Sequence, residues 1–149
     1  MSKQDIEDRM YMEIARIAAE RSHDPKYKVG CVIVTPDHQM TIGWNGTAEG
    51  TDNQMREPRL IRHASGCLHL QMQTKPTVLH AEMNALAKFA GSTASAAGGA
   101  LYSTLSPCVP CALQAYRSKI KRVIYDGLYN DLSGIEYLYD RGLEVRRIR

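Results

Sequence analysis

Two short segments of this chain carry residues that could hold a metal ion and activate a water molecule. His80 is followed two residues later by Glu82, and Cys108 is followed three residues later by Cys111 in a Pro-Cys-Val-Pro-Cys segment. Catalytic zinc typically takes three protein ligands and keeps a fourth position for water. His80, Cys108 and Cys111 supply that number, and Glu82 would stay free to accept and pass on the proton of the water. The spacing therefore predicts metal-assisted hydrolysis.

Both segments are typical of helix beginnings, which would position these side chains. A spacing of three residues places Cys108 and Cys111 on one helix face, and proline is tolerated in a first helical turn because its missing N–H has no partner there. The positive end of a helix also favours the thiolate that zinc binds. On a second helix beginning at His80, Glu82 would point away from the ligand position and toward the activated water.

Periodicity and turn residues predict the order α-β-β-α-β-α-β-α-β. The predicted helices cover 5–21, 80–90, 108–118 and 132–141, and the predicted strands cover 29–35, 40–45, 100–104, 122–125 and 143–148. The last three strands are joined through helices and should be parallel, with right-handed crossovers. We expect an α/β fold, a three-layer α/β/α arrangement with a mixed five-stranded sheet. Residues 46–75 are polar with little periodicity and predict a long irregular loop.

Composition restricts the class of protein. The 149 residues predict a single domain over 1–149, and 44% hydrophobic residues are enough for a core. The chain has no apolar run near membrane-spanning length and no signal-peptide pattern, so we expect a cytoplasmic protein. Cys31 lies in an apolar run and is expected to be a buried thiol. The net charge of +3 suits an anionic substrate, and the basic stretch 117–122 is more typical of a solvated helix end than of a nucleic-acid patch.

Several segments of the chain match the motifs of one known family. They are 21–25 with 29–30, 42–46 with Gly50, 80–85, 104–108, and Tyr129 with Asp131. The H-x-E and P-C-x-x-C motifs among them match the signature of zinc deaminases. Through these segments the chain resembles, over nearly its whole length, the deoxycytidylate (dCMP) deaminases of the cytidine deaminase-like superfamily. The resemblance implies one catalytic Zn²⁺ per chain and hydrolysis of dCMP to dUMP and ammonia, which supplies dUMP for thymidylate synthesis. Glu82 would be the proton shuttle.

The resemblance also implies contacts with the nucleotide. Asn45 would contact the sugar hydroxyl and Tyr129 would lie near the 5′-phosphate, while Lys28 is a further candidate for the phosphate. Other roles stay open, because Asn45 and Gly46 form a strong turn signal and Tyr129 could be an ordinary surface residue.

Regulation and assembly are implied in the same way. Members of the family are activated by dCTP, inhibited by dTTP and assembled as homohexamers, and Mg²⁺ could accompany a triphosphate. The candidate effector residues are Trp44, Gly46, Gly50, Asn84 and Lys88. The loop at 47–49 lacks the proline usual in the family. Some relatives carry a second zinc whose ligands come from the region of His63, Cys67 and His69. That spacing is not a strong metal pattern in this chain, and we expect a solvated loop there.

Three alternatives share part of this pattern. A nucleic-acid deaminase of the tRNA adenosine type would use the same zinc and glutamate, but the chain shows no clear basic stripe. A free cytidine deaminase usually has Cys in place of His80. A non-catalytic zinc module would need a fourth protein ligand and would not need Glu82.

Overall fold

The computed structural model describes all 149 residues. Its elements are α1 (Lys3–Ala19), β1 (Gly30–Val34), β2 (Met40–Trp44), β3 (Arg56–Arg62), β4 (Leu68–Thr74), α2 (Ala81–Ala87), β5 (Ala100–Leu105), α3 (Val109–Arg117), β6 (Arg122–Gly127), α4 (Ser133–Asp140) and β7 (Glu144–Arg147). All four predicted helices and all five predicted strands are present, with ends that differ by a few residues. Helix α1 begins earlier than predicted because Ser2 and Asp5 cap it reciprocally.

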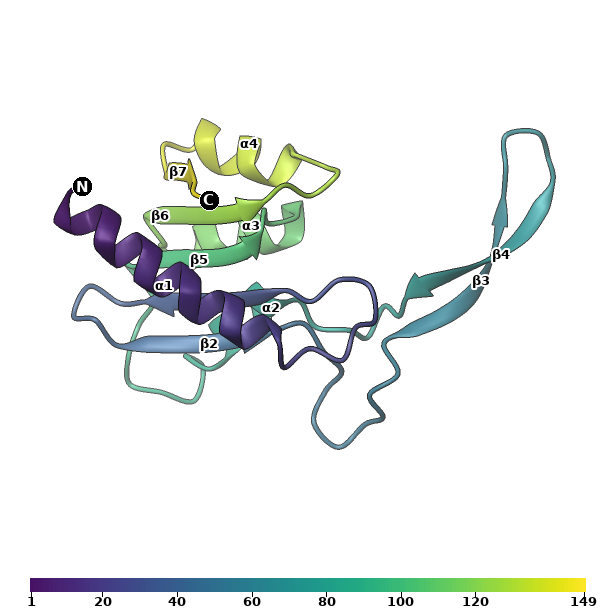
Figure 1. The fold of residues 1–149 in the computed structure, drawn as a ribbon, viewed down its shortest axis with the longest axis horizontal. Coiled ribbons are helices and arrows are strands. Elements are labelled where there is room, and N and C mark those ends of the chain that lie inside the picture. The colour runs from purple at the N-terminus through teal and green to yellow at the C-terminus, as the bar shows by residue number, and fades with distance from the viewer.

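Five strands form one mixed sheet in the order β2-β1-β5-β6-β7 (Figure 1). Strand β1 runs antiparallel to both β2 and β5, whereas β5, β6 and β7 are mutually parallel. The predicted α/β class and the parallel arrangement of the last three strands are therefore confirmed.

Helices cover both faces of this sheet, and two separate cores result. Strand β1 is buried along its whole length, and its alternate residues point to opposite faces. Val32 and Val34 pack with α1, whereas Cys31 and Ile33 pack with residues of α2, α3 and α4. Cys31 is thus a fully buried core residue, as predicted. None of the helices combines the length and the apolar composition that crossing a bilayer demands.

Helix α2 lies unusually close to the sheet. A Cβ at Gly43 on β2 would lie 2.3 Å from the carbonyl oxygen of Ala81 and 2.6 Å from the amide nitrogen of Ala85. Only glycine permits this approach of backbone to backbone. The close approach fixes the N-terminal end of α2 against the sheet, and His80 lies at that end.

The prediction of an irregular loop over 46–75 is wrong for most of its length. Strands β3 and β4 pair antiparallel into a two-stranded hairpin that projects from the body of the molecule (Figure 1), and we call residues 56–74 the arm. A turn with Gly66 at a φ of 87° reverses the chain at its tip. In β4, leucine and methionine alternate with polar residues, which is a strand pattern. The pattern contains only three apolar residues and therefore predicts a strand only weakly.

One face of the arm carries exposed apolar side chains. Leu60 and Leu70 are cross-strand partners, and the side chains of Leu68 and Met72 are exposed on the same face. We call Leu60, Leu68, Leu70 and Met72 the apolar stripe. Their exposure ranges from 52% for Leu68 and Met72 to 72% for Leu70. A lone two-stranded hairpin is only marginally stable in water, so an exposed apolar face on such a hairpin is unusual.

His63, Cys67 and His69, the candidates for a second zinc site, lie at the tip of the arm. The rings of His63 and His69 stack with centroids 4.2 Å apart, and Cys67 is exposed. The three side chains do not bring their ligand atoms together as a metal-binding group. The expected solvated loop is therefore an ordered hairpin end.

Candidate metal centre and adjoining pocket

Two helix N-termini meet on one face of the sheet and carry the predicted ligands. His80 is the N-cap of α2, and Cys108, which lies three residues after the last residue of β5, is the N-cap of α3. Cys111 lies in the first turn of α3, where Pro110 needs no hydrogen-bond partner for its nitrogen. Because α2 and α3 are packed neighbours, their first turns face each other.

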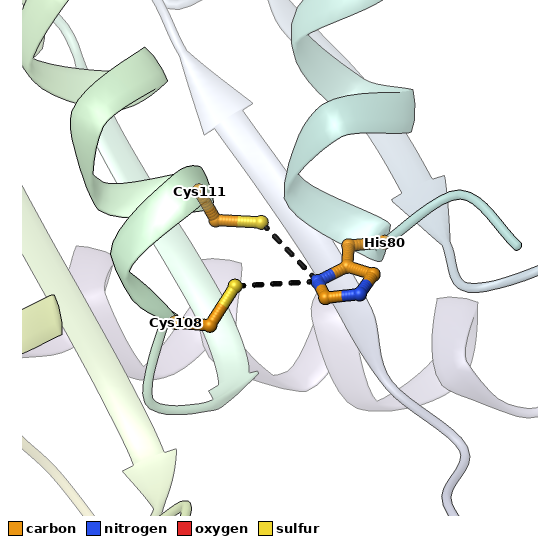
Figure 2. A group of neighbouring side chains, drawn as sticks. All are labelled: His80, Cys108 and Cys111. Atoms are coloured by element: carbon orange, nitrogen blue, oxygen red, sulfur yellow. Dashed lines mark hydrogen bonds between the residues drawn. The ribbon is translucent and has the colours of Figure 1, made fainter. Parts of the chain in front are cut away.

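The three ligand side chains are close enough to hold one metal ion (Figure 2). The sulfurs of Cys108 and Cys111 each lie 3.4 Å from Nδ1 of His80, and all three ligand atoms lie within 4.8 Å of one another. Zn–S bonds of about 2.3 Å and Zn–N bonds of about 2.0 Å at tetrahedral angles place sulfur and nitrogen about 3.5 Å apart. The donor set and its spacing therefore fit zinc. No fourth His, Cys, Asp or Glu joins the group, and three ligands are typical of a catalytic site rather than a structural one.

The two thiols are electrostatically unequal without a metal. Hydrogen bonds from Cys111 and His80 lower the pKa of Cys108, while the hydrogen bond with Cys108 together with burial raises the pKa of Cys111. The hydrogen bond with Cys108 also raises the pKa of His80. A second negative charge is thus unfavourable in this group until a cation occupies it, which is the behaviour expected of a metal site.

Glu82 lies beside the ligands but is not one of them. It is 4% exposed, and the hydroxyl of Ser103 on β5 donates to its Oε1 at 3.3 Å. Burial raises the pKa of Glu82, although His80 nearby opposes part of that shift. A buried carboxyl group whose pKa lies above its usual value is suited to accept a proton and return it, as a general acid and base must.

Helix α4 supports the metal centre from outside. A Cβ at Gly134 would lie 2.0 Å from the carbonyl oxygen of Pro107 and 2.8 Å from the carbonyl carbon of Cys108. The first turn of α4 therefore touches the backbone that presents Cys108, and this contact requires glycine.

A pocket of about 240 Å³ opens beside the metal centre. Its size is near the lower end for small-molecule sites, about 300 Å³. The residues that line it are Asp24, Tyr27, Val29, Asn45, Arg56, Thr74, Val78, His80, Ala81, Glu82, Leu105, Ser106, Cys108 and Tyr129. Half of these residues are hydrophobic, and the others include Glu82, Asp24 and Arg56. Apolar side chains combined with polar groups are typical of a site for a small organic substrate.

The structure brings two of the three predicted substrate contacts into this pocket. Tyr129 lies on its rim, 43% exposed, and its amide donates to the hydroxyl of Ser106 at 2.7 Å. Asn45 is buried; its Oδ1 accepts from the amide of Val29 and its Nδ2 donates to the carbonyl oxygen of Tyr27, both at 2.8 Å. Asn45 thus shapes the wall as well as facing the cavity.

Lys28, the third predicted contact, does not line the pocket. It lines a second, larger groove of about 1100 Å³ together with Trp44, Gly46 and Lys88. Asn84 lies beneath this groove and donates to the carbonyl oxygen of Trp44 at 2.6 Å. Gly50 is exposed, with a φ of 81°, and is not among the lining residues.

Cations surround the aromatic ring in this second groove. The guanidinium of Arg21 lies 4.5 Å and the ammonium of Lys88 lies 5.3 Å from the centre of the Trp44 ring. His23 and Lys28 add further basic side chains. The groove is therefore an aromatic and basic surface, separate from the pocket of Glu82.

Several pocket residues were not predicted as site residues from the sequence. Asp24, Tyr27 and Ser106 lie in or beside the motifs that match the deaminase family. Those motifs alone do not indicate that the three side chains form part of the pocket wall. Arg56 and Thr74 belong to the two ends of the arm. No local pattern marks them, because only the path of the arm brings them to the pocket.

A three-layer α/β/α domain with a His-Cys-Cys group that fits zinc at two helix N-termini, and a buried glutamate beside it, defines the class of zinc-binding deaminase domains. Residues 5–126 match the family model for the cytidine and deoxycytidylate deaminase zinc-binding region. The chain belongs to this family.

Individual relatives agree with this assignment. Deoxycytidylate deaminase of Schizosaccharomyces pombe is 35% identical over 94% of this chain, and that of Saccharomyces cerevisiae is 33% identical over 94%. The chain spans less than half the length of either yeast protein, 43% and 44%. The structure of dCMP deaminase from the cyanophage S-TIM5, in complex with dCMP and dUMP, is 33% identical with a TM-score of 0.81, and the match covers 99% of both chains.

Proposed function

We propose that this protein catalyses the zinc-dependent hydrolytic deamination of dCMP to dUMP and ammonia. The observation that carries the proposal is the buried carboxyl of Glu82 beside a three-ligand metal group at the end of a small pocket. The full-length similarity to a cyanophage dCMP deaminase that binds dCMP and dUMP supports the choice of substrate.

The residues of the site would have separate roles in the reaction. His80, Cys108 and Cys111 would hold zinc, which when bound lowers the pKa of water enough to make a nucleophile at neutral pH. Glu82 would accept one proton of the attacking water and deliver it to N3 of the cytosine while the water oxygen adds to C4. It would then take the remaining proton from the new C4 hydroxyl and deliver it to the amino group, so that the C4 carbonyl forms as the C4–N bond breaks. Water thus replaces the amino group, and ammonia leaves. Ser103 holds the carboxyl of Glu82 in place through its hydrogen bond.

Asn45 and Tyr129 are the proposed contacts for the sugar and the outer part of the nucleotide. One N–H of the Asn45 amide is not used by the bond to Tyr27, and it can donate to a sugar hydroxyl. Tyr129 has a half-exposed ring at the rim, where its hydroxyl can donate to a group that extends toward solvent.

The first experiment compares dCMP with deoxycytidine at matched concentration, followed by loss of cytosine absorbance. A strong preference for dCMP would support the proposal. Treatment with a chelator should abolish the rate and added Zn²⁺ should restore it. If the zinc-loaded protein acts on neither compound, the proposal fails, and dCTP and then RNA become the substrates to test.

We also propose that the second groove binds a nucleoside triphosphate effector. Trp44 between Arg21 and Lys88 can stack on a base while the cations meet the phosphates. The dCMP rate should rise with dCTP and fall with dTTP, and repeating the titrations with Mg²⁺ tests whether a metal accompanies the triphosphate. A dCMP rate profile that neither triphosphate alters would remove this proposal.

We propose further that the protein is a homo-oligomer, a hexamer by its family, and that the apolar stripe of the arm lies in an interface between copies. The support is the exposure of four large apolar side chains on one face of a lone hairpin. Light scattering after gel filtration should give an assembly for the wild-type protein and a smaller species for Leu70→Lys. Gln71→Lys is the matched control, because residue 71 points to the other face of the same strand. A monomeric wild-type protein would contradict the proposal.

A further inference from the structure

The pocket beside Glu82 contains a single permanently charged cation. Arg56 is the only arginine or lysine among its lining residues, whereas Asp24 and Glu82 supply two carboxyl groups. Resting on the proposed function, we infer that Arg56 binds the 5′-phosphate of the substrate and sets the preference for nucleotide over nucleoside.

Arg56 is held in place by two other residues of the pocket wall, Asp24 and Tyr27. Its Nε donates to Oδ1 of Asp24 at 3.4 Å, and its side chain is only 14% exposed. Asp24 is itself fixed, because the same oxygen accepts from the amides of Lys26 at 2.8 Å and Tyr27 at 2.9 Å. The guanidinium also lies 5.9 Å from the centre of the Tyr27 ring. Its orientation is therefore set before any ligand arrives, which reduces the entropy lost on binding.

These contacts leave most of the donors of Arg56 available. A guanidinium has five N–H groups in a fork that matches two oxygens of a phosphate. Only Nε faces Asp24, Nη1 makes a long contact of 3.5 Å with the carbonyl oxygen of Met72, and Nη2 donates to no protein atom. The distance to Asp24 is also longer than the 2.7–2.9 Å or so of a strong charge-assisted bond. The ion pair thus orients the guanidinium without saturating it.

No other side chain of the pocket can neutralise a phosphate. The hydroxyl of Tyr129 is a neutral donor, and Lys28 lies in the second groove. Without Arg56 the two carboxyl groups would make the pocket repel an anion. Arg56 is also the first residue of the arm, so the phosphate contact joins the arm to the pocket.

The test uses the zinc-loaded protein and the ratio of kcat/KM for dCMP to kcat/KM for deoxycytidine. Arg56→Gln should lower kcat/KM for dCMP about 10- to 100-fold, the range for loss of charged hydrogen bonds, with a higher KM and little change for deoxycytidine. Arg56→Lys keeps a charge and a partner for Asp24, and should recover part of the ratio. Arg59→Gln is the control, because that exposed arginine on the same strand pairs only with Glu57.

Circular dichroism and zinc content establish that each variant is folded before its rates are compared. An unchanged ratio in either folded Arg56 variant, or equal losses for both substrates, would overturn the inference while the proposed function stands. A wild-type protein inactive on dCMP would instead refute the proposed function. If Arg56→Gln does not fold, Arg56→Lys decides alone, with a lowered ratio expected and an unchanged ratio contradicting the inference.

Discussion

Replacing Gly134 by alanine tests whether helix α4 supports the metal centre. The added Cβ would lie 2.0 Å from the carbonyl oxygen of Pro107, whereas ordinary contacts begin at 3.4 Å. The two backbones must therefore separate by about 1.4 Å, since neither atom belongs to a flexible side chain. Overpacking of this kind costs about 1–3 kcal/mol. If the strain is relieved by moving Cys108 away from His80, the same energy reduces zinc affinity by about 10- to 100-fold.

Competition with a chromogenic chelator measures the zinc affinity, and thermal unfolding of the zinc-free protein measures the cost to the fold. Gly91→Ala is the matched control, because a Cβ there has no neighbour within 4 Å and the backbone φ of Gly91 is not positive. We expect weaker zinc binding for Gly134→Ala alone. If both variants bind zinc as tightly as the wild-type protein, the proposed support of Cys108 by α4 is wrong.

Three further variants separate catalysis, metal binding and stability. Glu82→Gln keeps the shape of the side chain but cannot carry a proton, so kcat should fall about 10²- to 10⁴-fold at unchanged zinc content; an active variant would exclude the shuttle role. Cys108→Ala should instead lose the metal, which elemental analysis would detect, and full retention of zinc would contradict its role as a ligand. Asp8→Asn should destabilise the protein by about 3 kcal/mol at pH 7, because buried Asp8 accepts hydrogen bonds from Arg122, Tyr102 and Gln4. Burial alone raises the pKa of Asp8, but these bonds outweigh it and lower the pKa below 3.8, so the stabilisation is present above about pH 4 and is lost at lower pH. Denaturant unfolding at pH 7 and pH 3 should show the difference between wild type and variant shrink, and a constant difference would contradict the role of the charge.

The metal centre could be predicted from the sequence because its geometry is local. The spacing of Cys108 and Cys111 and the position of His80 at a helix start are properties of single turns, and the alternation of helices and strands determined which turns would meet. The same argument predicts the four helices and the five strands of the main sheet, with its last three strands parallel, and the structure confirms these; the two strands of the arm are absent from the predicted order.

Which other residues line the pocket depends on the tertiary fold and not on local sequence. Lys28 is a predicted phosphate contact, but its neighbours Tyr27 and Val29 line the pocket whereas Lys28 lines the other groove. Neighbours in extended backbone point to opposite sides. Arg56 reaches the pocket only because the arm begins there, and the arm was missed because its strands bury no continuous face and so give a weak apolar pattern.

The central strand lies between the two metal-bearing segments in sequence. His80 precedes β5 and Cys108 follows it, and β5 pairs with both β1 and β6. The ligands can therefore meet only after this strand has taken its place in correct register. In a zinc finger the metal drives folding, whereas here the ligand residues come together only in the paired sheet, so a bound ion would stabilise the correctly paired molecule over other arrangements. A molecule with a misplaced central strand would not retain the metal, so occupancy serves as a check on assembly.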